Sequence, residues 1–282
     1  MLCFYIYIVI YMTTEVVLLI KTNYYYDVLE WIEYYKKLGF DHITIYDNDS
    51  NIDFLNIINK YKNFISYIKI SGFPDQLNLE LKHYNNSKYD YVFFADNDEF
   101  LWLSPKYKNI NDYIEQKTKE FNCNHIAIYW IKISANPMIE NRLDLPDTTQ
   151  IKTFKYIQET EIDSWCKCIY KTKLPIESME CHFCKPFNDI KDTNGNVFIK
   201  QRIFYRNYDY KNDDALIYHY YHKSYKEYND KINGNCATEN ILLSSRLTNY
   251  NYKNYYTYLK ILYNIGYCKY DNTVETFLYG KY

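Results

Sequence analysis

Apolar runs and amphipathic stretches alternate along the first hundred residues. Residues 28–38, 54–61 and 76–84 repeat apolar positions at helical spacing, with Asp27 as the expected N-cap of the first helix and Gly39 at its end. The continuous apolar runs between them are typical of strands buried on both faces, and they cover residues 15–20, 42–46, 64–70 and 89–95. This β-α-β-α-β-α-β order predicts a parallel sheet with right-handed crossovers.

The pattern is less regular after residue 100. Two prolines and the lack of a period mark residues 136–149 as a long loop beside the expected ligand site. We expect one main α/β domain over residues 13–235, an apolar extension at 1–12, and a Tyr-rich helical or irregular segment at 236–282. The other predicted elements are helices at 110–121, 226–231 and 239–247 and strand-rich stretches at 125–133, 153–170 and 215–224.

The stretch at residues 91–100 joins a buried strand to an acidic turn. Its apolar run ends in Asp96, Asp98 and Glu99. Two carboxylates at positions i and i+2 offer the hard oxygen ligands that Mg²⁺ and Mn²⁺ prefer, and such an ion can bind a diphosphate. Taken alone, these residues are equally compatible with an ordinary acidic turn after a strand.

Polar residues follow three of the predicted strands. Lys21 and Asn23 come after the first strand, residues 47–50 after the second and residues 96–99 after the fourth. Because ligands of open parallel sheets bind at the carboxyl ends of the strands, we expect these clusters to converge on one site. The sequence has no G-x-G-x-x-G after the first strand and no G-x-x-x-x-G-K-[ST]. A Rossmann dehydrogenase and a P-loop enzyme are therefore disfavoured.

Composition narrows the function classes further. The chain has 282 residues and a net charge of -2, which excludes a globally basic nucleic-acid-binding protein. Its 37 tyrosines, together with abundant Asn, Ile and Lys, indicate an A/T-rich genome such as that of a giant virus or a protist. Clusters of tyrosine therefore carry little functional information.

The first eleven residues are apolar, but a helix needs about 20 to span a bilayer. They lack the basic region and the cleavage site of a signal peptide, and we prefer Met12 as the working start. A glycosylation sequon at Asn48 falls in the expected nucleotide site, where a glycan would block function. A cytoplasmic or cytosol-facing location is therefore favoured, and attachment to a secretory-pathway membrane is the alternative.

Eight cysteines in a chain of this length do not indicate a disulfide framework. The group formed by Cys166, Cys168, Cys181, His182 and Cys184 suggests a zinc site. Thiols that alternate along a strand suit core packing equally well, so both interpretations stay open.

Five short motifs follow one another along the chain. They are Lys21-Thr22-Asn23; Glu30-Trp31-Ile32-Glu33-Tyr34 with Leu38-Gly39-Phe40-Asp41-His42; Ile45-Tyr46-Asp47-Asn48-Asp49-Ser50; Asp96-Asn97-Asp98-Glu99-Phe100-Leu101; and His219-Tyr220-Tyr221-His222-Lys223-Ser224 before Glu227, Tyr228 and Lys231. Their order resembles the family 2 and family 92-like glycosyltransferases of GT-A fold, over about residues 15–234. The resemblance implies an α/β, Rossmann-like, mostly parallel sheet flanked by helices, with a small mixed sheet on the acceptor side.

The resemblance also implies roles for individual residues. Asp96 and Asp98 match the D-x-D pair that binds Mn²⁺ or Mg²⁺ and, through the ion, a nucleotide-sugar diphosphate, and His219 matches a further metal ligand. Lys167 and then His182 match a lysine-led strand and a histidine that face the donor or the acceptor. Nucleotide contacts are implied for Lys21, Asn23, Asp47, Asn48 and Ser50, although the family's usual Lys-Asn-Glu is Lys-Thr-Asn here.

The implied reaction moves a hexose, with inversion, from a nucleotide sugar to a hydroxyl group of a glycan, a protein or a small molecule, and a UDP-sugar is the favoured donor. No motif identifies the base that takes the acceptor proton. Asp163 is our preferred candidate because it precedes a strand of the acceptor half. Glu99 is either another candidate, like Glu161 and Glu180, or a residue that orients the metal ligands.

Two other function classes stay open. In a haloacid-dehalogenase-like phosphatase, Asp96 would be the nucleophile and Asp98 the acid. Such enzymes place their D-x-D after the first strand and have Thr or Val where this chain has Phe100. The other alternative is a non-catalytic carbohydrate-binding or scaffold protein on a transferase fold. Three tryptophans either stack on a sugar or fill the core: Trp102, Trp130 and Trp165.

Overall fold

The computed structural model describes most of the chain. The described residues are 12–22, 24–72, 75–134, 141–144, 148–158, 162–180, 182–186, 189–199, 202–204, 212–221, 223–224, 226–227 and 268–280. Side chains are described for all of these except residues 143, 158, 162–164, 202–204 and 268. Within these ranges, none of the helices combines the length and the apolar character that crossing a bilayer requires.

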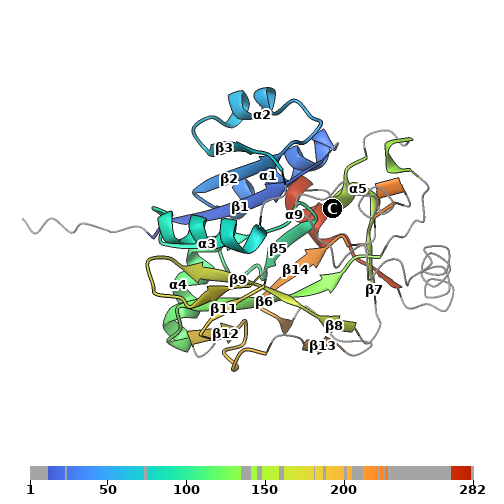
Figure 1. The fold of residues 1–282 in the computed structure, drawn as a ribbon. Helices are drawn as coiled ribbons and strands as arrows, with labels where there is room; N and C mark the ends of the chain where they lie inside the picture. Colours follow the sequence, from blue (N-terminus) through green and yellow to red (C-terminus); the bar gives the residue numbers. More distant parts are fainter. Residues whose placement is uncertain are drawn as a thin grey trace, which may run out of the picture.

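The predicted parallel sheet is present and forms one half of a nine-stranded sheet (Figure 1). Four parallel strands stand in the order β3-β2-β1-β4. Because β1 lies between β2 and β4, the residues that follow these three strands lie along one edge of the sheet. The bounds of the strands are β1 Thr14–Ile20, β2 His42–Asn48, β3 Ile65–Ile70 and β4 Tyr91–Phe94.

Beyond β4 the sheet continues with strands of both directions. β9 (Cys166–Lys171) lies antiparallel between β4 and β6 (His125–Lys132). β14 (Ala215–His219) runs parallel to β6 and antiparallel to β5 (Glu99–Leu103), a strand that the acidic turn before it conceals in the sequence. β12 (Ile190–Asp192) also pairs with β6. The predicted α/β class is therefore confirmed, with the mixed strands joined to the same sheet.

Helices cover both faces of the sheet. Neighbouring side chains of β4 point to opposite faces, since Phe93 contacts Tyr35 of α1 at 6.2 Å between ring centroids and Phe94 contacts His83 of α3 at 5.9 Å. The first helix ends, as predicted, at Gly39, whose φ of 94° suits glycine. In the part of the chain that the structure describes, the helices are α1 Tyr25–Leu38, α2 Phe54–Tyr61, α3 Gln76–Asn86, α4 Ile110–Phe121, α5 Gln150–Thr153 and α9 Thr273–Tyr279, with a 3-10 turn at Arg142–Asp144.

Short strand pairs accompany the main sheet. They join β10 (Ser178–Met179) to β11 (Cys184–Lys185), β8 (Ile162–Ser164) to β13 (Arg202–Phe204), and β7 (Tyr156–Gln158) to β15 (Cys268–Tyr270). The predicted helix at 239–247 lies outside the described residues, as do most of 226–231 and 1–12. The predicted domain bounds therefore stay predictions.

The prediction that Asp27 caps the first helix is wrong. α1 begins two residues earlier, at Tyr25, and Tyr24 occupies the N-cap position without a side-chain hydrogen bond. Asp27 is instead buried in the first turn, where its two carboxylate oxygens accept hydrogen bonds of 2.7 and 2.5 Å from Arg142. Asp27 thus binds an arginine that is distant in sequence, and does not cap the backbone N–H groups of the helix as the local pattern predicts.

The C-terminal helix α9 contacts α1 through a buried carboxyl group. Glu30 accepts a hydrogen bond of 2.7 Å from the Tyr279 hydroxyl and another from the Thr149 hydroxyl. Burial and the nearby Asp27 carboxylate raise the pKa of Glu30 to about 7. As the pH rises through about 7, Glu30 therefore gains a buried negative charge close to that of Asp27.

Glu30 is expected to lower the stability of the protein as the pH rises. Its folded-state pKa lies above the ordinary value of 4.5, so the folded protein binds the Glu30 proton more tightly than the unfolded chain does. The resulting contribution to the free energy of unfolding is complete below pH 4.5 and is lost as the pH rises through about 7. Glu30→Gln should remove up to about 3 kcal/mol of this pH dependence. Unfolding free energies from urea titrations across this pH range would measure it.

Glu177→Gln is the control, because Glu177 is exposed on the surface. It should leave the pH dependence of the unfolding free energy unchanged. The same slope in Glu30→Gln and in the wild type would contradict the assignment to Glu30.

Candidate active site

The acids after β4 lie in a turn whose backbone is held from several directions. Each carbonyl group from Asp96 to Glu99 accepts a hydrogen bond from a residue outside the turn. The donors are Trp31 Nε1 to Asp96 at 3.0 Å, Gln150 Nε2 to Asn97 at 2.5 Å, Tyr220 N to Asp98 at 2.8 Å and Tyr35 Oη to Glu99 at 3.0 Å. These contacts fix the turn and, with it, the positions of the two Asp side chains.

Asp96 lies beside Lys167, the lysine that we expected to face the donor or the acceptor. Lys167 Nζ is 3.3 Å from Asp96 Oδ2 and 3.7 Å from Glu99 Oε2. The Lys167 side chain is only 3% exposed, whereas the Asp96 side chain is 44% exposed. The Asp96 carboxylate can therefore contact a ligand from solvent while Lys167 supports it from the sheet.

Glu99 is buried behind Asp96. Its Oε2 atom accepts a hydrogen bond of 2.9 Å from the Asp96 backbone N–H. Burial raises the pKa of Glu99 well above its usual range, an effect that the Lys167 charge opposes and the Asp96 carboxylate reinforces. A buried carboxyl group that binds the turn favours the interpretation in which Glu99 orients the two acids.

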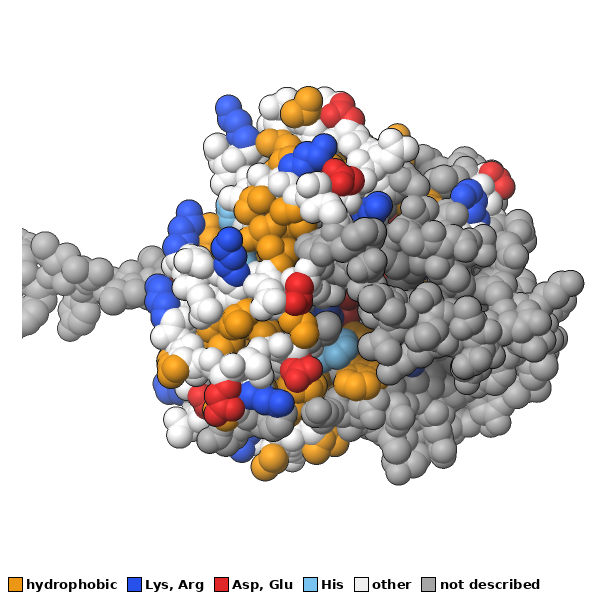
Figure 2. All heavy atoms as spheres, viewed as in Figure 1, with side chains coloured by type: hydrophobic (Ala, Val, Ile, Leu, Met, Phe, Trp, Pro, Cys, Tyr) orange, Lys and Arg blue, Asp and Glu red, His pale blue; other side chains and the backbone are white. Residues whose placement is uncertain are grey.

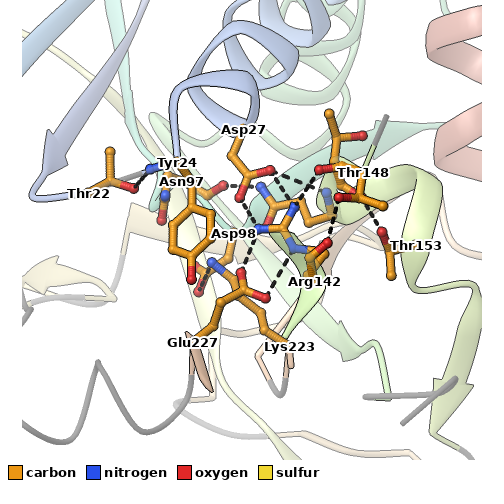
Figure 3. A network of polar contacts seen from close by, with 12 residues as sticks. Thr22, Tyr24, Asp27, Asn97, Asp98, Arg142, Thr148, Thr153, Lys223 and Glu227 are labelled. Atoms are coloured by element: carbon orange, nitrogen blue, oxygen red, sulfur yellow. Dashed lines mark hydrogen bonds and ion pairs between the residues drawn. The ribbon is translucent and has the colours of Figure 1, made fainter. Parts of the chain in front are cut away.

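Asp98 lies beside His219. Lys223 also lies next to Asp98 (Figure 3). Asp98 Oδ1 is 3.6 Å from His219 Nε2, and Asp98 Oδ2 is 3.6 Å from Lys223 Nζ. The strand register explains this approach, because His219 of β14 stands directly opposite Glu99 of β5. The side chains of Asp98, His219 and Lys223 are 7%, 5% and 15% exposed, so solvent screens their charges only weakly.

The loops after β1 and β2 are joined by hydrogen bonds. Thr22 N donates to Ser50 Oγ at 2.9 Å, and Ser50 N donates to Asp47 Oδ1 at 2.9 Å. Asp47 is buried, and its Oδ2 atom accepts from the Tyr67 hydroxyl at 2.7 Å. The structure thus brings Asp47 and Ser50 together with the end of β1, as predicted from the strand order.

The other expected nucleotide contacts are more dispersed. Asn48 Nδ2 donates to the Gly72 carbonyl at 3.0 Å and so points toward the β3–α3 connection. Lys21 follows β1 and is partly exposed, and Asn23 lies outside the described residues. Their roles in nucleotide binding stay predictions.

An aromatic wall, formed by Trp130, Trp165 and His182, lies next to His219. Between ring centroids, Trp130 is 4.3 Å from His219 and 5.1 Å from His182. The ring centroids of Trp165 and His182 are 5.0 Å apart. Burial and the Lys167 charge lower the pKa of His182 to about 3, so this wall carries no charge at neutral pH. Asp163 lies in β8 opposite Ile203, but its side chain is outside the description, and its role as a base stays a prediction.

The donor types of the predicted metal site fit a hard divalent cation. Carboxylate and imidazole groups are accepted by Mn²⁺, and carboxylates by Mg²⁺. Asp98 and His219 are adjacent, whereas Asp96 faces Lys167. Among the described residues, no three His, Cys, Asp or Glu side chains are arranged to hold a metal ion.

The described cysteines of the suggested zinc motif are buried thiols. Cys166, Cys168 and Cys184 are free, and burial raises the pKa of Cys184 to about 12. Among the described residues, these thiols are not joined by further His, Cys, Asp or Glu side chains into a group that could hold a metal ion, which favours the packing interpretation. Cys181 lies outside the described residues.

The sequence pattern alone does not identify Arg142, Gln150 or Lys223 as site residues. Lys223 belongs to the quoted motif that starts at His219, and this proximity is a signal that could have identified it. Arg142 is the one arginine in the loop expected beside the site, which is a weaker signal.

On the face shown in Figure 2, acidic, basic and histidine side chains meet in a hollow.

The fold and the site together define a class of protein. An open βα sheet whose fourth strand ends in D-x-D, with a lysine and a histidine of the mixed strands beside the acids, is the arrangement expected of a GT-A glycosyltransferase. The family model for glycosyltransferase family 92 matches residues 20–255, and the chain belongs to this family. The membership supports transferase activity, confirms the resemblance seen in the motifs, and disagrees with a phosphatase of the haloacid-dehalogenase type.

Solved structures of S. aureus TarS are similar at a low level. The 1–349 fragment in complex with UDP has 16% identity and a TM-score of 0.34 over 50% of this chain and 43% of that chain. The complex with UDP-GlcNAc has 14% identity and a TM-score of 0.32 over 50% and 42%. The chain thus spans less than half the length of these relatives, and no curated protein matches it by sequence.

Proposed function

We propose that this protein is a metal-dependent, inverting glycosyltransferase that moves a hexose from a nucleotide sugar, with a UDP-sugar favoured, to an acceptor hydroxyl. The observation that carries the proposal is the set of contacts of Asp96 with Lys167 and of Asp98 with His219 at one edge of the sheet. Acids that can bind a cation, placed beside a buried ammonium group, suit a diphosphate and its counter-ion.

In the proposed reaction, the acceptor oxygen bonds to the anomeric carbon while the bond from this carbon to the diphosphate oxygen breaks. The electron pair of the broken bond leaves with the nucleoside diphosphate. The acceptor proton passes to a carboxylate, for which Asp163 is our candidate. Because the acceptor attacks opposite the leaving group in a single displacement, the configuration at the anomeric carbon inverts.

The residues around the D-x-D turn would prepare the site for this step. Asp98 and His219 would hold Mn²⁺ or Mg²⁺ together with Asp96, whose side chain would have to turn from Lys167 toward them. The ion would neutralise charge on a bound diphosphate. Lys167, next to Asp96, would add positive charge from the sheet side. Trp31 and Gln150 hold the turn through its carbonyl groups, so little reorganisation would be needed when the donor binds.

Calorimetric titration with UDP, in the presence and absence of Mn²⁺, tests the proposal. We expect UDP to bind at least about tenfold more tightly with the ion, because the cation offsets repulsion between the diphosphate and the two carboxylates. A non-catalytic scaffold would show no binding in either condition, and that result would contradict the proposal. Hydrolysis of individual nucleotide sugars without acceptor would then identify the donor.

A further inference from the structure

Lys223 has an unusual backbone and a confined side chain. Its φ is 35°, in the left-handed region that residues other than glycine rarely adopt. Its side chain is 15% exposed, and its ammonium group lies 3.6 Å from Asp98 Oδ2. Such backbone strain persists only where surrounding contacts enforce it, and it is concentrated at functional sites.

The contacts that enforce this conformation start directly after Lys223. Ser224 donates from its backbone N–H at 3.2 Å and from its hydroxyl at 2.6 Å to Glu227 Oε2. Glu227 in turn accepts from Arg142 Nε at 3.0 Å and Nη2 at 2.5 Å. The segment that carries Lys223 is therefore anchored to a buried arginine.

Arg142 connects this segment to the first helix. Its guanidinium group is fully buried and also binds both carboxylate oxygens of Asp27 in the first turn of α1. The result is a row of alternating charges, shown in Figure 3, that runs Asp27, Arg142, Glu227, Lys223, Asp98. The negative charge of Glu227 favours a cation at Lys223, and Lys223 places that cation on the D-x-D acid.

A divalent cation and the Lys223 ammonium group would compete for Asp98. Two positive charges a few ångströms apart in a poorly solvated site repel each other strongly. A diphosphate that arrives with the divalent cation would offer Lys223 several new negative oxygens at the same place. Ammonium groups bind phosphate oxygens well, as point charges with three donors.

We propose that Lys223 is a diphosphate-binding residue. Its ammonium group pairs with Asp98 while the site holds no nucleotide, and it moves to the diphosphate oxygens when nucleotide and metal bind. This inference rests on the proposed function. It assigns to Arg142 and Glu227 the task of positioning the Lys223 segment.

The test compares Lys223→Asn with the wild type. Asparagine tolerates left-handed backbone and carries no charge, so the variant should fold while it lacks the ammonium group. Lys223→Arg keeps the charge and should retain most of the UDP affinity. Lys62→Asn, at an exposed lysine after α2, is the control for loss of one positive charge. Thermal unfolding of each variant checks the fold.

Calorimetry with three probes separates the roles. With Mn²⁺ present, Lys223→Asn should bind UDP at least about tenfold more weakly than the wild type, because a charge-assisted contact is lost. Its affinity for UMP, which lacks the second phosphate group, should fall less. Its affinity for Mn²⁺ alone should rise several-fold, because the competing cation is gone. A purely structural role of Lys223 would not strengthen metal binding.

The outcomes distinguish this inference from the proposed function. If the wild type binds UDP and Lys223→Asn binds UDP and Mn²⁺ equally well, only the role of Lys223 is overturned. A loss of UDP affinity that is matched for UMP, with unchanged Mn²⁺ affinity, overturns it as well. If the wild type binds no UDP with any metal, the proposed function fails and the role of Lys223 fails with it.

Discussion

Asp98→Asn is expected to lower kcat/KM for sugar transfer by about 10³-fold, the largest effect on activity that we expect of a single substitution. Asp98 is the acid that stands between His219 and Lys223, so its charge organises both groups. The amide has the same size as the carboxylate but is a poor ligand for Mn²⁺ and Mg²⁺. Initial rates with a UDP-sugar, at several donor and metal concentrations, would measure the effect.

Glu115→Gln is the matched control, since Glu115 is exposed on α4. It should retain wild-type kcat/KM. The Asp98→Asn variant should also keep a melting temperature close to that of the wild type, because the shape of the side chain is preserved. A loss of activity below tenfold in a folded Asp98→Asn variant would rule out Asp98 as a metal ligand or a diphosphate contact.

Arg142→Met is expected to destabilise the fold by about 3–5 kcal/mol, the largest effect on stability. Arg142 is fully buried and binds Asp27 and Glu227 with hydrogen bonds between 2.5 and 3.0 Å. Burial acts to lower the pKa of Arg142, but the two carboxylates raise it, so the arginine is charged at any ordinary pH. Its removal leaves two carboxylates buried together without the cation that both of them bind.

A triple variant separates the loss of the arginine from the cost of the unpaired acids. Asp27→Asn, Arg142→Met and Glu227→Gln together remove all three charges, and the variant should regain a substantial part of the stability lost in Arg142→Met. Urea titrations of the wild type, the single variant and the triple variant would measure the difference. Equal unfolding free energies of the two variants would show that the arginine stabilises by packing rather than by charge.

The first half of the sheet could be predicted well because its signals are local. A strand buried on both faces must be apolar throughout, and an amphipathic helix must repeat every three to four residues, so β1 to β4 and α1 to α3 are visible as patterns. Among the later strands, β5 begins directly in the acidic turn that follows β4, and β7 and β8 have only three residues each. Their pairing partners are distant in sequence, and no local pattern specifies them.

The candidate site also has one part that local patterns predict and one part that depends on pairing between distant strands. The convergence of Asp47, Asp96 and Asp98 on one edge follows from strand order, which the alternation of helices and strands implies. The approach of Lys167 to Asp96 depends on β9, which inserts antiparallel next to β4 and is not fixed by any nearby residue. The motif resemblance identified Lys167 as a site residue, but only the pairing of β9 with β4 explains why Lys167 lies next to Asp96.

By itself, the sequence determined the α/β class, the edge of the sheet where the polar groups gather, and the acids that lie there, because burial periodicity and strand order are properties of consecutive residues. The tertiary structure decided the charge state and the partners of those acids. Burial raises the pKa of Glu99, and Lys223 lies next to Asp98. Arg142 binds Asp27, which the local pattern predicts as a helix N-cap. These effects depend on desolvation and on contacts between residues at least 115 positions apart, and neither is encoded in a local pattern.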